Sequence, residues 1–134
     1  MDTIDPVILE KVSPWDFERT IEFLLGAATK LNWNILTIHD LQQSLAKAGK
    51  MVNPVKVLEI CKPEHSGKIL SKNDERIVSV LLPCRISVYV KEDGKTYVAI
   101  MNISALMNAM PKTAHKVMTA ASDELTEIVD SVIG

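Results

Sequence analysis

The 134-residue sequence contains few of the residues on which specialised scaffolds and active sites depend. It has two cysteines, five glycines and only 4% aromatic residues. Two cysteines are too few to hold a disulfide-rich scaffold together. There is no glycine-rich loop to bind a phosphate, no serine in a nucleophile elbow and no His-Glu-x-x-His motif. The common signatures of enzymes are therefore missing.

The sequence also lacks a dominant charge and long apolar runs. Lys and Arg total 15, Asp and Glu total 17, and the two signs are interspersed. Without a basic stripe to neutralise phosphates, we expect no nucleic-acid partner. No apolar run reaches the roughly 18 residues of a membrane span. The chain starts with Asp2 and Asp5 where a secretion signal would carry Lys or Arg, so we expect a cytoplasmic protein with no membrane partner.

What the sequence does contain is typical of one folded domain. Hydrophobic residues make up 47% of the chain, which is too much for a disordered protein. The length suits one core, and no linker, repeat or low-complexity tract interrupts it. We therefore expect residues 1–134 to form a single domain.

The first forty residues predict a strand, a helix and a second strand. Residues 6–12 form a short apolar run that Pro6 opens. Ser13 is placed to cap the helix, with Asp16 closing a capping box. Asn32 ends the helix, and residues 33–38 alternate as a strand. The apolar face of the helix is formed by Phe17, Ile21, Leu24, Ala28 and Leu31.

Two short helices and a third strand are predicted next. Asp40 and Gln43 form a second capping pattern, and Gly49 stops that helix. Residues 55–61 alternate as a strand, and Pro63 opens another short helix. The apolar face of the first of these helices consists of Leu41, Leu45 and Ala48.

A hairpin follows, with strands over residues 84–91 and 96–102. A two-residue loop at Asp93-Gly94 would pair Ile86 with Met101. A type I turn with Gly94 as a bulge would instead pair Ile86 with Ile100 and Val88 with Val98. The bulged register is preferred, because it places the β-branched residues of both strands on one face. Tyr89 and Tyr97 then meet on the other face, which would mark a dimer or ligand surface if no helix covers it.

The C-terminal segment predicts a second long amphipathic helix. Its apolar stripe consists of Met118, Ala121, Leu125, Ile128 and Val132. The residues predicted to face water are Asp123, Glu124, Glu127 and Asp130. Two long helices with one apolar stripe each favour the same face of a mostly antiparallel sheet. The predicted fold class is therefore α+β, with two layers.

The two cysteines are the main candidates for chemistry. Cys61 ends a strand just before a Pro-opened helix, and Cys84 starts a strand just after Pro83. If these strands are antiparallel neighbours, the thiols lie close together. Cys61 would also face the N-terminus of a helix, with Lys62 and Arg85 nearby, and each of these features favours a thiolate.

Three interpretations of the cysteines remain open at this point. They are small buried hydrophobic residues, a redox or sulfur-carrying pair, or metal ligands. In the last case His65 would complete a Cys61–His65–Cys84 site for Zn²⁺ or Cu(I), one ligand short of a structural zinc site.

The methionines and the other histidines are weaker candidates. Met101, Met107, Met110 and Met118 surround His115, and together they suggest either a thioether copper site or flexible core filler, of which filler is favoured. We interpret His39 as a surface residue at a helix start and His115 as an exposed helical residue.

Read together, the two cysteine segments resemble the small family known as domain of unknown function 302. Its pattern has Cys-x-Pro, a short helix ending in Leu, Leu-Pro-Cys opening a strand that reads Val-x-Val-Tyr, and an Asp-Gly hairpin. The matching positions are Cys61-Lys62-Pro63, Leu70, Leu82-Pro83-Cys84, Ile86-Ser87-Val88-Tyr89 and Asp93-Gly94. The resemblance extends from about Phe17 to Val132. The chain departs from the family at Asn32-Trp33, where Gly and an aromatic are usual, and at Lys62, where Asn is common.

The resemblance implies a curved antiparallel sheet with two longer helices on one side, similar to the TATA-binding-protein-like arrangement. It implies no DNA binding, because the basic face is absent, and it implies a homodimer. It supplies no established activity and no catalytic residues. Cysteine at both positions belongs to the family pattern, which strengthens the thiol and metal interpretations together.

Our first hypothesis is a thiol-based module, in which Cys61 is the reactive sulfur and Cys84 its resolving or co-ligating partner. The alternative is a non-catalytic homodimeric binding module whose cysteines are structural. An enzyme with a paired-carboxylate site is the weakest hypothesis, since the acidic residues fall mainly on predicted water-facing surfaces.

Overall fold

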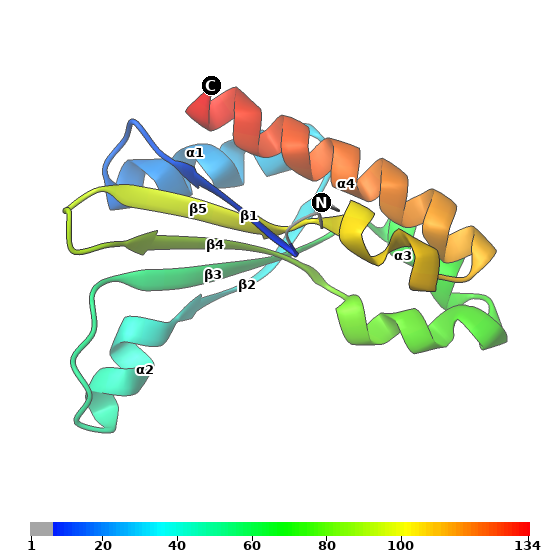
Figure 1. Cartoon of the computed structure of the whole chain (residues 1–134), viewed down its shortest axis with the longest axis horizontal. Helices are drawn as coiled ribbons and strands as arrows, with labels where there is room; N and C mark the ends of the chain where they lie inside the picture. The colour runs from blue at the N-terminus through cyan, green and yellow to red at the C-terminus, as the bar shows by residue number, and fades with distance from the viewer. Residues whose placement is uncertain (1–6) are drawn as a thin grey trace, which may run out of the picture.

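A five-stranded antiparallel sheet forms one layer of the molecule (Figure 1). The computed structural model describes residues 7–134, apart from the side chains of Ser104, Met107 and Asn108. Asp2, Asp5 and Pro6, on which the sequence analysis drew, lie outside the described residues. The strand order is β1-β5-β4-β3-β2. The strands are β1 (Ile8–Val12), β2 (Asn34–Asp40), β3 (Val55–Cys61), β4 (Cys84–Val90) and β5 (Thr96–Met101).

Two long helices, α1 (Phe17–Lys30) and α4 (Lys112–Ile133), pack side by side on one face of the sheet (Figure 1). Leu24 of α1 and Leu125 of α4 are almost fully buried, as their positions on the apolar stripes predict. The sheet contributes every second residue to the same core, including Leu58, Ile60, Ile86, Val88 and Val98. The predicted two-layer α+β arrangement is confirmed.

The β4–β5 hairpin has the predicted bulged register. Ile86 pairs with Ile100 and Val88 with Val98. Gly94 has φ +78°, and its N–H donates to the carbonyl of Lys91 at 2.9 Å. Because this left-handed conformation suits glycine, the bulge forms there and sets the register of the whole hairpin.

Helix capping agrees with the sequence at one position and differs at another. The side chain of Asp40 accepts from the N–H of Gln43 and caps α2 (Leu41–Lys47), as predicted. Ser13 does not cap α1, and this prediction was wrong. Asp16 is the cap, accepting from the N–H of Arg19 at 2.8 Å. The Ser13 hydroxyl is buried instead, 2.7 Å from the Thr20 hydroxyl.

A second, smaller core lies beyond the end of the sheet. It is enclosed by α3 (Pro63–Leu70), the 3-10 helices η1 (Asn73–Leu81) and η2 (Ile103–Ala109), and the first turns of α4. Figure 1 shows η1 and η2 extending from the end of the sheet, beneath the start of α4. Its buried residues are Ile69, Val78, Ile103, Ala114, Val117 and Met118. The sequence patterns did not predict η1 and η2, because a 3-10 helix does not repeat with the 3.6-residue period of an α-helix.

Exposed apolar side chains occur on η1 and in the loop before β3, where Val80 and Met51 are the most exposed, and also on the two edge strands. Ile8 in β1 is 63% exposed and Leu36 in β2 is 54% exposed. The apolar face of α2 is not buried either, since Leu41 and Leu45 are both 40% exposed. Within the described residues no helix has both the length and the apolar character needed to cross a bilayer.

Candidate functional site

The end of β3 lies beside the start of β4, as the thiol hypothesis requires. Ile60 is the antiparallel partner of Cys84, and Cys61 follows Ile60 directly. Both cysteines are partly buried free thiols. They line the same narrow pocket of about 20 Å³, together with Trp33, Ile69 and other residues. A space of this size holds one water molecule at most, so the two cysteines share a small, partly open environment.

Cys61 lies at the junction between β3 and α3. Lys62 adopts extended backbone at the N-cap of α3, and Pro63 occupies the first turn, where a missing N–H costs nothing. The Sγ atom of Cys61 is 3.3 Å from the hydroxyl of Ser66 on α3. A hydroxyl at this distance can donate to a thiolate or accept from a thiol. Local chain geometry therefore gives Cys61 a polar partner at the start of a helix.

Cys84 has a more apolar environment. Burial raises the pKa of its thiol from 9.0 to about 11, and the nearby Cys61 adds to the increase. Cys84 also packs against the main core. It is therefore protonated at neutral pH, and only a thiolate is strongly nucleophilic. The two cysteines differ in chemical character although they line one pocket.

A half-buried polar cluster adjoins the thiol pocket, and Glu124 of α4 is at its centre. One carboxylate oxygen of Glu124 accepts from Lys62 Nζ at 2.6 Å and from the Trp33 indole N–H at 3.2 Å. The other oxygen is bonded to His65 Nε2. Burial by itself raises the pKa of Glu124, but the hydrogen bonds from Lys62 and His65 outweigh it and lower the pKa overall.

The position of Glu124 corrects the sequence analysis, which placed it on the water-facing side of its helix. Glu124 lies three residues after Ala121 and next to Leu125, at the border of the apolar stripe. The side chain is only 21% exposed. Its partners come from the N-cap of α3, from α3 itself and from the segment before β2, so no local sequence pattern indicates them. Its position at the border of the apolar stripe was the one sequence feature that could have indicated that Glu124 is largely buried.

The predicted metal site would be formed by Cys61, His65 and Cys84. His65 uses its Nε2 atom to contact Glu124, although it also lines the pocket that the two cysteines line. In the part of the chain that the structure describes, no three His, Cys, Asp or Glu side chains are grouped so that they could hold a metal ion. The Cys61–His65–Cys84 set for Zn²⁺ or Cu(I) therefore receives no support from the geometry.

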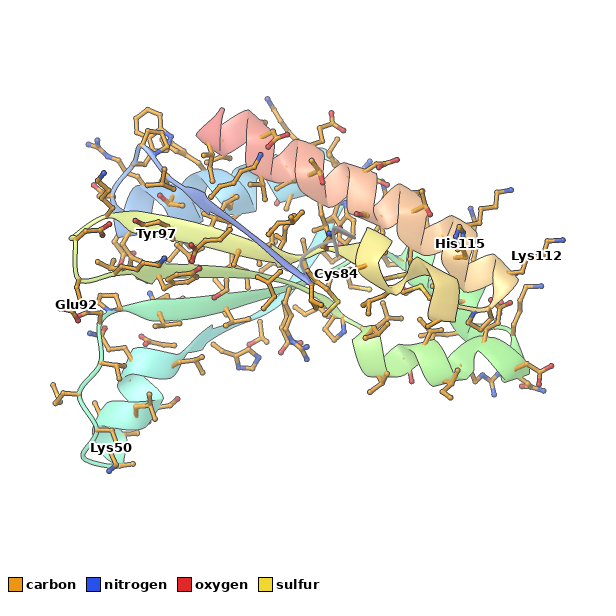
Figure 2. All side chains as sticks on the ribbon, in the orientation of Figure 1. Lys50, Cys84, Glu92, Tyr97, Lys112 and His115 are labelled. Carbon is orange, nitrogen blue, oxygen red and sulfur yellow. The ribbon has the colours of Figure 1, made fainter. Side chains whose placement is uncertain are left out.

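The remaining sequence candidates lie apart from one another. Met118 is buried in the second core and Met110 packs at its border, whereas Met101 is 36% exposed. The Met107 side chain is outside the described atoms. His115 is exposed on α4, and Figure 2 shows it well away from Cys84. His39 is also exposed, but it belongs to β2 and contacts Glu59.

The predicted tyrosine pair is present. Tyr89 and Tyr97 are register partners, and their rings stack with centroids 6.1 Å apart. The Lys91 Nζ atom lies 4.1 Å from the centre of the Tyr97 ring. The Tyr89 hydroxyl contacts Glu10, which connects β4 to the edge strand β1. Figure 2 places Tyr97 near the hairpin end of the sheet, far from the thiol pocket.

Comparisons with other proteins agree with this architecture. An uncharacterised protein of Aquifex aeolicus is 28% identical over 129 residues, which cover 93% of this chain and 83% of that protein. The crystal structure of an uncharacterised conserved DUF302 protein from Bacillus stearothermophilus superposes with a TM-score of 0.83 at 20% identity. The superposition covers 94% of this chain and 98% of that one. The model of the family described as domain of unknown function DUF302 matches residues 9–132, and the chain belongs to that family.

Proposed function

We propose that this protein is a small thiol-exchange module in which Cys61 carries a sulfur-linked group. The observation that supports the proposal is that two cysteines from the ends of neighbouring strands line one pocket and have different chemical character. The pair therefore divides into an attacking sulfur, Cys61, and a protonated neighbour, Cys84.

The surroundings of Cys61 support its role as the attacking sulfur. The Ser66 hydroxyl is within hydrogen-bonding distance, and the first turn of α3 begins two residues later. A helix N-terminus stabilises a nearby negative charge, and a hydroxyl donor does the same. Lys62 Nζ is ion-paired with Glu124 in the adjoining cluster and so brings no uncompensated charge to Cys61. Exchange needs an attacking sulfur with polar neighbours, and of the two cysteines Cys61 has the more polar surroundings.

The reaction consistent with this arrangement is exchange with a small disulfide, R–S–S–R. The Cys61 thiolate attacks one sulfur, the S–S bond breaks, and one R–S⁻ leaves and takes a proton from water. Cys61 then carries R as a mixed disulfide, Cys61–S–S–R. The electrons balance, because the substrate disulfide is replaced by one new disulfide and one thiol.

Release of the R group from Cys61, by formation of a Cys61–Cys84 disulfide, is expected to be slow. Cys84 must first lose its proton, and its pKa of about 11 opposes this at neutral pH. The adduct on Cys61 therefore persists, which favours a carrier over a rapid redox switch.

Reaction with glutathione disulfide at pH 7, followed by mass spectrometry of the intact chain, tests the proposal. Wild type and Cys84→Ser should each gain one glutathione on Cys61, and Cys61→Ser should gain none. The same proteins in denaturant should react at every cysteine, which shows that the reagent is competent. Equal reaction of Cys61 and Cys84 in the folded protein, or reaction of neither, would overturn the proposal.

The alternative is a homodimeric binding module with structural cysteines, and the exposed apolar β1 edge favours it over a monomeric binding module. Ile8 is 63% exposed and Val12 is 48% exposed, an unusual pattern for an isolated strand edge. Analytical ultracentrifugation tests this second candidate. The alternative expects a dimer for wild type that Ile8→Lys dissociates, and a monomer at all concentrations would contradict it.

A further inference from the structure

A second, larger pocket lies where β4 begins and β5 ends. Its volume is about 270 Å³, it is partly open to solvent, and its lining includes residues of both the main core and the second core. Its walls come from both sheet and helices, so it is part of the architecture rather than a gap beside one loop. Residues that form the walls include Val57, Leu81, Ala99, Ile103, Met118 and Leu125. Figure 2 places Cys84, which also lines it, at the end of the sheet where the helical segments begin.

The size of the pocket restricts what it can hold. An apolar cavity of about 150 Å³ binds a molecule as small as benzene, and a water occupies about 30 Å³ of liquid. By the same measure, 270 Å³ accommodates a molecule of about ten non-hydrogen atoms. Walls of this kind favour the binding of an apolar group, because the transfer of apolar surface from water into the pocket lowers the free energy.

Two polar side chains also line the pocket, and the positive charge on one of them favours a negatively charged ligand. Arg85 and Ser87 line the pocket and are two residues apart on β4, so both lie on the sheet face opposite the core residues Ile86 and Val88, where Arg85 is exposed. Within the described residues, no carboxylate lies within ion-pairing distance of the Arg85 guanidinium. Glu59 is its cross-strand neighbour, but the Glu59 carboxylate contacts His39 instead. The pocket therefore combines apolar walls with an unpaired cation.

We propose that this pocket binds a small apolar monoanion, a carboxylate of about ten non-hydrogen atoms. Its apolar body lies against the apolar walls, and its carboxylate pairs with Arg85 and the Ser87 hydroxyl on the sheet face opposite Ile86 and Val88. A guanidinium is well suited to this role, because its N–H groups match the two oxygens of a carboxylate. This site does not require that Cys61 reacts, so it stands whether or not the protein exchanges thiols.

Calorimetric titration with octanoate tests the site. Octanoate should bind, butanoate should bind much more weakly, and octanol should bind about tenfold more weakly because it lacks the charge. Arg85→Gln should weaken octanoate binding about tenfold as well. Lys50→Gln, which removes a cation at the far end of the molecule (Figure 2), should leave it unchanged. The aromatic acid 3-phenylpropanoate, of similar size, shows whether a straight chain is required.

The position of the ligand is tested separately through Cys84, which lines the pocket. In the Cys61→Ser protein, octanoate should slow alkylation of Cys84 at least severalfold, whereas octylammonium should not. Ala99→Phe, which fills the pocket, should abolish octanoate binding, and circular dichroism checks that this variant folds. The proposal is overturned if octanoate fails to bind, if octanol binds as well, or if Cys84 is not protected.

Discussion

The carboxylate of Glu75 in η1 accepts a hydrogen bond of 2.6 Å from the backbone N–H of Ala114 in α4. Helix α4 starts after Pro111 and has no side-chain cap of its own. Glu75, only 8% exposed, therefore supplies from another segment the acceptor that an N-cap residue usually provides. Its negative charge at the helix N-terminus is favourable too. The second core thus includes one of the contacts that determine where α4 begins.

Replacing Glu75 should destabilise the fold through this cap. Glu75→Ala leaves the N–H of the fully buried Ala114 without its acceptor, so we expect a loss of about 1–3 kcal/mol. Glu75→Gln keeps an acceptor oxygen and should cost less. Urea unfolding followed by circular dichroism measures both variants. If Glu75→Ala unfolds at the wild-type urea concentration, the contact does not cap the helix in solution.

The pKa of Glu124 predicts how stability depends on acid pH. Its pKa is lower in the folded protein than the ordinary value of 4.5, so the ionised carboxylate stabilises the fold above that value. This contribution is lost as the pH falls from there through the folded pKa. Glu124→Gln should therefore be less stable than wild type at pH 7, with a gap that narrows toward pH 3. Urea midpoints across this range measure the gap, and Asp123→Asn, at an exposed neighbouring position, is the control.

The Cys84 thiol should react only slowly at neutral pH. Because burial raises the pKa of Cys84 to about 11, its alkylation by iodoacetamide should be slow at pH 8 and accelerate tenfold per pH unit up to that value. Cys61→Ser removes the second cause of the shift, so the Cys84 profile should move toward lower pH. Mass spectrometry of peptides locates the label. A Cys84 that alkylates with an ordinary thiol profile would mean that the pocket is open to solvent.

Core leucines and surface leucines provide a test of the packing. Leu24 and Leu125 are 0% and 3% exposed, so Leu24→Ala and Leu125→Ala should each cost about 2–5 kcal/mol. Leu36, 54% exposed in β2, is the matched control, and Leu36→Ala should change stability by about 0.5 kcal/mol or less. A mild effect at either core position, measured by urea unfolding, would mean that its helix is not packed as described.

The parts of the fold that were predictable depend on local patterns. The hairpin register follows from β-branched residues that must share a face, and the Asp40 cap follows from its spacing to Gln43. The neighbouring positions of Cys61 and Cys84 followed from one strand ending and the next beginning.

What was not predictable depends on partners distant in the sequence. Ser13 fits a cap as well as Asp16 does, and only burial against Thr20 decides between them. The Glu124 cluster gathers Trp33, Lys62 and His65 from separate segments. The large pocket is bounded by η1 and η2, whose 3-10 geometry has no clear sequence period.

Two glycines give opposite predictions from the same substitution. Gly26 lies on an exposed face of α1 with open space around the position of a Cβ atom, so Gly26→Ala should stabilise the protein by about 0.5–1 kcal/mol through helix propensity. Gly94 also has open space, but its φ of +78° is one that a side chain disfavours. Gly94→Ala should therefore destabilise by about 1–2 kcal/mol. Because neither methyl group meets a neighbour, thermal unfolding of the pair isolates the backbone contribution, and the same sign at both positions would contradict the bulged turn.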